Sequence, residues 1–211
     1  FMEIDLVANI CFNEVVINTL PTVALDIMEH LELDDNMFNF NTLIPEPPEL
    51  TDLNYVMRGK GTYYYSQKEW EAHGGTKEPG SFPGVDWCLD HPVDEFTLAR
   101  IERACGTKSW KDWRLLNWGC KWNAGDVKHE IKAVDKNDHS AGGADRVYLI
   151  YRFTTPWAEP KGIIAALMAY LEAETLEVDD PNLMLCWRFM DEADHFQGEI
   201  RCPADMEEMY E

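Results

Sequence analysis

The sequence predicts an α+β fold in which an antiparallel sheet carries two helices on one face. Several segments rich in β-branched residues alternate between apolar and polar side chains, which is typical of strands with one solvated face. Two segments with helical spacing of apolar residues each follow such a strand. A long segment rich in Pro, Gly and Tyr separates the first strand and helix from the rest, and we expect it to be an irregular insertion.

The first two elements are a strand and a helix. Residues 9–19 (NICFNEVVINT) contain several β-branched side chains, which favour a strand. Pro21 suits the first turn of a helix, and the apolar residues after it predict a helix over 21–33. The polar sequence Asp34-Asp35-Asn36 ends this helix.

The insertion spans residues 36–107. Its prolines exclude regular helix or a central strand over much of its first part, and we expect one short helix near 67–73. The aromatic side chains Tyr63, Tyr64, Tyr65 and Trp70 either stack on a base or sugar or attach this loop to the protein body. We favour the second interpretation, in which these aromatic side chains attach the loop to the protein body.

The second half of the chain supplies most of the expected sheet. Residues 94–105 predict a helix that Gly106 ends. Residues 110–122 alternate so that Trp110, Trp118 and Trp122 would share one face of a strand. The remaining expected elements are strands over 127–134, 146–155, 183–190 and 195–201, and a helix over 158–173.

This order of elements is β-α-β-β-α-β with additional strands, which is the split βαβ, or ferredoxin-like, plan. We therefore expect one domain with a core of about residues 9–35 and 108–202. The insertion 36–107 would extend from that core.

Charge is distributed unevenly along the chain. The formal net charge is −21, and residues 1–57 hold 11 acidic residues with no Lys or Arg. Residues 172–211 hold 13 acidic residues against Arg188 and Arg201. Such acidity disfavours direct binding to nucleic acid or to an anionic membrane. The acidic ends either form a solvated surface that keeps the protein in solution or form a binding surface.

The chain offers little for catalysis, metal binding or membrane insertion. Motifs such as GxSxG, HExxH, a P-loop or GxGxxG are absent, although a Cys–His pair distant in sequence stays possible. Cys88-x-x-His91 has no second ligand pair, so we expect no metal and no cofactor. No apolar stretch is long enough for a membrane span, and residues 1–20 lack the basic start of a signal peptide. We therefore expect a cytoplasmic protein with reduced thiols, and the family resemblance described next implies a bacterial host.

Five segments resemble the YubB-like, Api-type proteins of phages and plasmids. They are Asn9-Ile10-Cys11-Phe12-Asn13, Phe40-Asn41-Thr42-Leu43-Ile44-Pro45-Glu46-Pro47, Asn117-Trp118-Gly119-Cys120-Lys121-Trp122-Asn123-Ala124, Phe153-Thr154-Thr155-Pro156-Trp157-Ala158-Glu159-Pro160 and Phe196-x-Gly198. The resemblance covers residues 9–200 and implies a ferredoxin-like domain encoded by a mobile element. It implies no activity, and "ferredoxin-like" names a fold without an iron–sulfur cluster.

The leading functional hypothesis is a non-enzymatic protein that acts by contact with a host protein. A basic, nucleic-acid-binding partner would suit its charge, as in a host-defence inhibitor or a nucleic-acid mimic. The acidic surface would lie on the two helices, above the Trp118 and Trp122 side of the sheet. Its expected residues are Glu29, Glu32, Glu172, Glu174, Glu177, Asp179 and Asp180.

A second hypothesis is a small-molecule or nucleotide-binding module, with or without enzymatic activity. It would use the sheet face and the aromatic insertion. The residues that could form the floor of a ligand groove are Asn117, Lys121, Asn123 and Trp157. The same segment could instead hold the Pro-rich residues 40–48 against the sheet, and the sequence does not separate the two.

Overall fold

The computed structural model describes residues 9–76, 81–135, 145–178, 180, 182–193 and 195–202, with the backbone alone over 174–178. The chain divides into two compact units. The first unit draws on residues 1–45 and 115–211, and the second unit is Glu46–Arg114.

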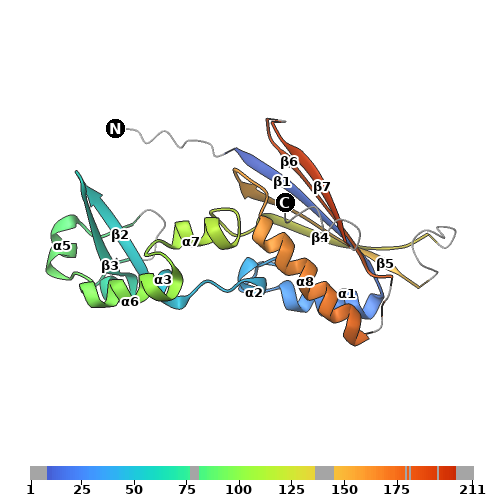
Figure 1. The fold of residues 1–211 in the computed structure, drawn as a ribbon, viewed down its shortest axis with the longest axis horizontal. Helices are drawn as coiled ribbons and strands as arrows, with labels where there is room; N and C mark the ends of the chain where they lie inside the picture. Colours follow the sequence, from blue (N-terminus) through green and yellow to red (C-terminus); the bar gives the residue numbers. More distant parts are fainter. Residues whose placement is uncertain are drawn as a thin grey trace. The chain divides into compact units, whose positions relative to one another are not determined.

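A five-stranded antiparallel sheet forms the framework of the first unit (Figure 1). Its strands are β1 (Ile10–Thr19), β4 (Gly125–Ala133), β5 (Val147–Pro156), β6 (Met184–Asp191) and β7 (Gln197–Cys202). Their order across the sheet is β4-β5-β1-β6-β7, so β1 lies at the centre between β5 and β6. The α+β class and these five strands confirm the prediction, with ends that differ by at most two residues.

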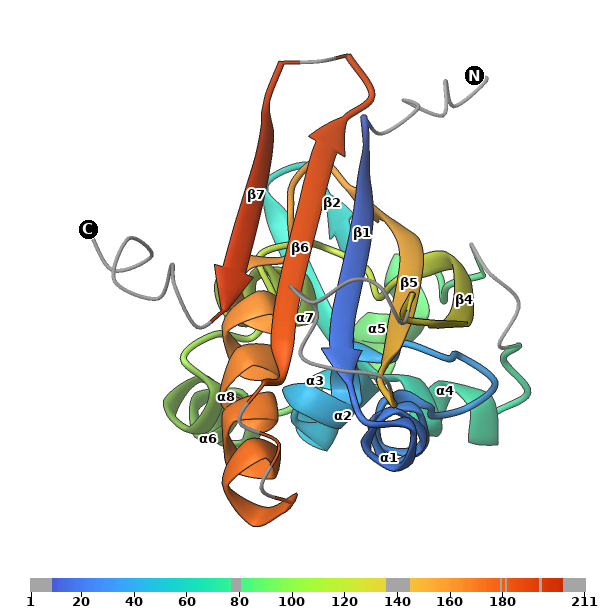
Figure 2. The same ribbon diagram turned by 90° about the vertical axis from the view of Figure 1, so that its right-hand side faces the viewer.

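The helices of the first unit lie on one face of this sheet, as Figures 1 and 2 show. They are α1 (Pro21–Leu31), α2 (Phe40–Leu43) and α8 (Lys161–Val178). His30 of α1 stacks on Tyr170 of α8 at a ring-centroid distance of 4.1 Å. The expected pair of neighbouring helices on one face is therefore present.

The core of the first unit is aromatic, and part of it comes from a segment that we had expected to lie outside it. Phe38 and Phe40 are fully buried. The Phe38 ring contacts Tyr151, Phe153 and Trp187 at centroid distances of 5.0, 4.8 and 6.0 Å. Residues 36–45 thus belong to the first unit, because their aromatic side chains pack between the helices and the sheet.

The second unit has its own structure, so the expectation of an irregular insertion is wrong. A hairpin of β2 (Leu53–Arg58) and β3 (Gly61–Ser66) packs with helices. These helices are α3 (Pro48–Asp52), α4 (Gln67–Ala72), α5 (Val85–Asp90) and α6 (Glu95–Cys105). Gly106, at φ 77°, caps α6 as predicted.

The aromatic residues of the second unit form a small core. Tyr65 is buried with Val56 and Cys88, and Trp70 and Trp87 pack against this cluster. Tyr65 meets Trp70 edge-on at a centroid distance of 6.1 Å. Neither alternative for the aromatic segment described this arrangement, because both assumed a loop without strands.

The first and last residues of the second unit are paired. The Arg114 guanidinium donates to the Glu46 carboxylate from Nε and Nη2, at 3.1 and 2.5 Å. The Glu46 side chain is only 4% exposed. The two ends of this unit therefore meet.

The strand predicted over residues 110–122 is wrong. Residues 110–117 form helix α7 (Trp110–Asn117), and residues 118–124 follow as irregular backbone. The Ser109 hydroxyl accepts a hydrogen bond from the Asp112 backbone N–H at 3.2 Å, which is a typical N-terminal cap. Trp118 is fully buried whereas Trp122 is 46% exposed, so these two side chains do not share a buried face.

Candidate functional site

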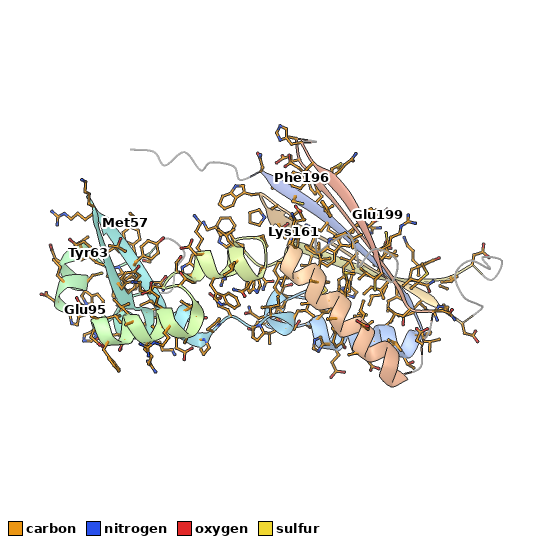
Figure 3. The ribbon with its side chains drawn as sticks, viewed as in Figure 1. Met57, Tyr63, Glu95, Lys161, Phe196 and Glu199 are labelled. Atoms are coloured by element: carbon orange, nitrogen blue, oxygen red, sulfur yellow. The ribbon has the colours of Figure 1, made fainter. Side chains whose placement is uncertain are left out.

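The outer side of the two neighbouring helices carries exposed carboxylates without compensating bases. The exposed acids are Asp26, Glu29, Glu32 and Glu172, and we call them the acidic helical surface. None of the four forms an ion pair with another described residue. Lys161, at the start of α8 (Figure 3), pairs with Glu159 at 3.1 Å.

Asp180 was predicted to lie on this surface, but it is buried. Its side chain is 2% exposed, and Arg146 Nη1 donates to its Oδ1 at 2.6 Å. Thr19 Oγ1 donates to Asp180 Oδ2 at 2.9 Å. The Arg146 guanidinium also donates to Asn18 Oδ1 and to the backbone carbonyls of Asn18 and Asn182. Asp180 is thus a structural residue that ties the end of β1 to the segment before β6.

The protonation of Asp180 follows from this environment. Burial alone would raise the pKa of its carboxyl. Hydrogen bonds from Arg146 and Thr19 and the Arg146 charge outweigh the burial, so the pKa of Asp180 lies below its ordinary value. Asp180 is therefore ionised at neutral pH and unavailable to a partner.

Three further predicted residues of this surface have no described side chain. Glu174 and Glu177 lie on α8, where only the backbone is described, and Asp179 lies outside the described residues. The acidic helical surface therefore rests on Glu29, Glu32 and Glu172 of the predicted set, together with Asp26.

The predicted ligand groove separates into a structural part and an exposed part. Asn123 Oδ1 accepts from the backbone N–H of Phe40 at 2.8 Å, and Asn123 Nδ2 donates to Asn39 Oδ1 at 2.7 Å. Asn117 ends α7, and its backbone carbonyl lies against Gly162 so closely that a Cβ on that glycine would collide with it. The Asn123 side chain thus joins the segment after α7 to the start of α2, and the Asn117 backbone packs against the start of α8.

Lys121 and Trp157 do come together. The Lys121 ammonium lies 4.1 Å from the Trp122 ring centroid and 5.7 Å from that of Trp157. The two indole rings are stacked at 6.3 Å and each is more than two-fifths exposed. The Lys121 ammonium therefore already makes cation–π contacts with both rings.

The residues around Trp118 support the structural interpretation of this segment. Trp118 Nε1 donates to the Ile44 carbonyl at 2.9 Å, and its ring meets Phe40 edge-on. Gly119 has φ 89°, and a Cβ there would lie 2.7 Å from the Lys161 backbone nitrogen. The backbone at the start of α8 therefore passes close to Gly119.

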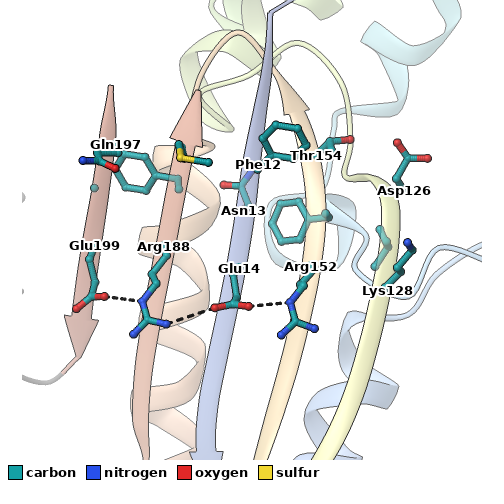
Figure 4. A pocket seen from close by; sticks show the side chains of 15 residues that line it. Phe12, Asn13, Glu14, Asp126, Lys128, Arg152, Thr154, Arg188, Gln197 and Glu199 are labelled. Carbon is teal, nitrogen blue, oxygen red and sulfur yellow. Dashed lines mark hydrogen bonds and ion pairs between the residues drawn. The ribbon is translucent and has the colours of Figure 1, made fainter. Parts of the chain in front are cut away.

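A site that sequence reasoning missed lies on the sheet face opposite the helices. The even-numbered residues point to this open face on β1, β5 and β6 and on β4 from Lys128 onward, and on β7 the odd-numbered residues do. Seven charged side chains cross it as one chain of alternating sign, part of which is drawn in Figure 4. In order they are Lys132, Glu130, Arg152, Glu14, Arg188, Glu199 and Arg201, which we call the ion-pair row.

The contacts along the ion-pair row are short except one. Arg152 lies 2.7 Å from both Glu130 and Glu14, and Arg188 lies 2.6 Å from Glu199. The contact between Arg188 and Glu14 is longer, at 3.4 Å. Hydrogen bonds from Arg152 and Lys132 lower the pKa of Glu130, and those from Arg188 and Arg201 lower the pKa of Glu199. With four bases and three acids, the row has a net charge of +1 on a chain of −21.

Apolar side chains flank the ion-pair row on both sides. Toward the start of β1, Phe12 and Met190 line a broad hollow of about 1040 Å³ (Figure 4). Toward its end, Val16, Met184 and Cys186 line a smaller hollow. Arg152 and Arg188, which line the larger hollow, already bind carboxylates. Lys128 also lines it and forms no ion pair with another described residue.

The described residues show no arrangement typical of a metal site or membrane span. No group of three or more His, Cys, Asp or Glu side chains is placed there to hold a metal ion. No helix in the described part of the chain is long and apolar enough to cross a membrane. All six cysteines are free thiols, of which Cys11, Cys88 and Cys120 are buried.

The comparisons with known proteins identify no relative. No family model, no curated protein and no solved structure matches the chain. The resemblance to YubB-like, Api-type proteins therefore stays a prediction.

Proposed function

We propose that this chain is a non-enzymatic binding protein that presents the acidic helical surface to a basic protein partner. The observation that carries the proposal is the contrast between the two faces of the sheet unit. On the open face, Glu14, Glu130 and Glu199 are each bound to a base. The exposed acids of α1 and α8 have no such base within the described residues, so their charge is directed to the solvent.

The kind of partner follows from this chemistry. Regularly spaced carboxylates on a helical surface attract clustered Lys and Arg side chains, and a groove built to hold phosphates contains such clusters. We propose a nucleic-acid-binding host protein as the partner and a mobile genetic element as the origin of the chain, in line with the sequence resemblance. The role would then be inhibition of a host-defence or other DNA-binding protein by competition with nucleic acid.

The proposed fold assignment is ferredoxin-like. Its support is the position of β1 between β5 and β6, which helix α8 connects, with β4 beside β5. That arrangement is the one expected of two interleaved βαβ units, and β7 extends it at one edge.

The test is charge reversal on the acidic helical surface. The variant E29K/E32K/E172K changes the net charge by +6, and it should lose the partner captured from a bacterial lysate by the unchanged chain. Retention of that partner should fall steeply between about 0.05 and 0.3 M salt, because exposed charges are screened over about 10 Å at 0.1 M. Its melting temperature should change by only a few degrees, since exposed charges contribute about 0–1 kcal/mol each.

A matched control distinguishes the effect of charge on the acidic helical surface from the effect of total net charge. The variant D90K/E95K/E102K changes three exposed acids of the second unit and also shifts the net charge by +6. It should keep the partner. If both triple variants bind equally, or if the captured partner binds no nucleic acid and carries no basic groove, the proposal fails.

A further inference from the structure

We propose that two copies of this chain associate through their open sheet faces, with the ion-pair row of each copy lying against that of the other. The first argument is electrostatic. Each copy carries a net charge of −21, so most encounters bring like charges together. The ion-pair row on the open face has a net charge of +1. Association through this face leaves the acidic helical surface of both copies in solvent.

The alternation of charge makes the ion-pair row complementary to itself. Consider a two-fold axis parallel to β1 that passes between the positions of Glu14 and Arg188. Rotation about it places Glu14 opposite the partner's Arg188 and Arg188 opposite the partner's Glu14. The same rotation places Arg152 opposite the partner's Glu199. Arg152 and Arg188 of each copy therefore meet carboxylates of the other copy, and the arrangement is self-complementary, as an isologous interface requires.

The geometry of the row favours this position of the axis. The contact between Arg188 and Glu14 is 3.4 Å, the longest in the row, whereas Arg152 and Glu14 are 2.7 Å apart. The Arg188 guanidinium can therefore turn toward a second carboxylate at the smallest loss of an existing contact.

Apolar side chains would meet apolar side chains in the same arrangement. A two-fold axis parallel to the strands keeps the direction along β1, so the Phe12 end of one face meets the Phe12 end of the other. Phe12, Met190 and Met184 are 46, 42 and 45% exposed, which is high for large apolar side chains on central strands. Their burial would add a hydrophobic contribution to the free energy of association, which the ion-pair row alone does not supply.

The open face has the size of a stable interface. Five strands spaced about 4.8 Å apart, with about eight residues each, cover roughly 24 by 26 Å. That flat projection of about 600 Å² lies near the roughly 800 Å² per partner of a standard interface, because side chains add to the accessible area.

The test measures the mass of the full chain in solution, by light scattering or sedimentation at about 5–200 µM and 0.15 M salt. The unchanged chain should reach twice the chain mass within this range. E14R places arginine opposite the partner's Arg188, and R188E places glutamate opposite the partner's Glu14. Each variant alone should dimerise at least tenfold more weakly.

Mixing the two variants gives the decisive result. In a mixed dimer, Arg at position 14 of one copy faces Glu at position 188 of the other, and the second contact keeps its natural Arg and Glu. An equimolar mixture should therefore recover dimerisation to within about threefold of the unchanged chain. F12S, which leaves the ion-pair row intact, should also weaken the dimer, and circular dichroism would verify that each variant is folded.

A control variant on the acidic helical surface distinguishes failure of the dimer proposal from failure of the proposed function. E32R makes the same charge change on the acidic helical surface, and it should leave the dimer unchanged while weakening partner capture. The proposal is overturned if the unchanged chain stays monomeric at 200 µM, if E14R dimerises normally, or if the mixture stays monomeric. A nucleotide or other small molecule that raises the melting temperature of a monomeric chain, and does so less for E14R, would assign the face to that ligand instead.

Discussion

Replacement of Arg146 by methionine should destabilise the first unit more than any change on its surface. The guanidinium is 5% exposed and donates to both carboxylate oxygens of Asp180, at 2.6 and 3.2 Å. It also satisfies Asn18 Oδ1 and two backbone carbonyls, at 2.9, 3.0 and 2.8 Å. R146M keeps much of the aliphatic volume, so the loss isolates the charge and its hydrogen bonds.

The expected magnitude comes from the carboxylate that remains. Breaking a buried ion pair by removing one partner costs about 3–5 kcal/mol, because the other charge stays buried without compensation. The first unit draws on roughly 140 residues. At about 2.1 cal/mol/K of unfolding entropy per residue, 4 kcal/mol corresponds to a fall of about 14 °C in melting temperature.

The pH dependence identifies the cause of the loss. In the unchanged chain the pKa of Asp180 is below its unfolded value of about 3.9. Its contribution is thus present above pH 4 and is lost as the pH falls through the folded pKa. In R146M the buried carboxyl has no guanidinium, so its folded pKa should rise above the unfolded one, and the penalty grows as the pH rises. The stability difference should therefore be larger at pH 7 than at pH 4.

Urea unfolding of both chains at pH 7 and pH 4 measures this difference. R146M/D180L removes the stranded charge and should recover more than half of the loss at pH 7. A difference that is equal at the two pH values, or a double variant as unstable as R146M, would refute the role assigned to the Asp180 charge.

Two further outcomes test local features of the fold. In urea unfolding, G119A should lower the free energy of unfolding more than G106A. Both glycines have positive φ, but only at Gly119 would a new Cβ lie against backbone, 2.7 Å from the Lys161 nitrogen. Equal losses of stability would contradict this close approach. Burial raises the pKa of the Cys11 thiol to about 11, so iodoacetamide at pH 8 should alkylate Cys11 only as fast as the chain unfolds, measured by mass spectrometry of its peptide. Labelling of Cys11 at the rate seen in urea would show that its environment is open.

Local sequence patterns predicted most strands of the five-stranded sheet and several helix ends, because these signals are strong and agree with the packing. β1 and β5 have β-branched residues at the positions that pair across the sheet, such as Val16 opposite Ile150. Pro21 begins α1 and Gly106 follows α6, as predicted from their fixed backbone preferences.

The strand predicted over residues 110–122 is wrong because the prediction followed the alternation of apolar residues and overlooked a helix cap. The alternation of Trp110 to Trp122 matches a strand, but Ser109 and Asp112 form a helix cap three residues apart, and the helix forms. Asp180 was assigned to the surface because it follows an acidic segment, and only the tertiary fold brings Arg146 to it. Ion pairs between residues so far apart in sequence leave no pattern in either segment.

The ion-pair row was missed for a related reason. Arg152 and Arg188 are each the one base in a strand of mainly apolar or aromatic residues, which is a signal that a partner lies across the sheet. Identifying that partner requires the strand order and register, which join Glu14 to both arginines. The composition of the strands alone gives neither.

The pairing of Glu46 with Arg114 has a consequence for how this chain can be rebuilt. Because Glu46 and Arg114 are ion-paired, the hairpin and helices between them form a cassette whose two ends lie close together, with the second end inside α7. Every strand of the five-stranded sheet is encoded outside that cassette. A short linker in its place, or a foreign domain whose termini are equally close, should leave the strand order intact, so the junction is a natural position for grafting and for reporter insertion.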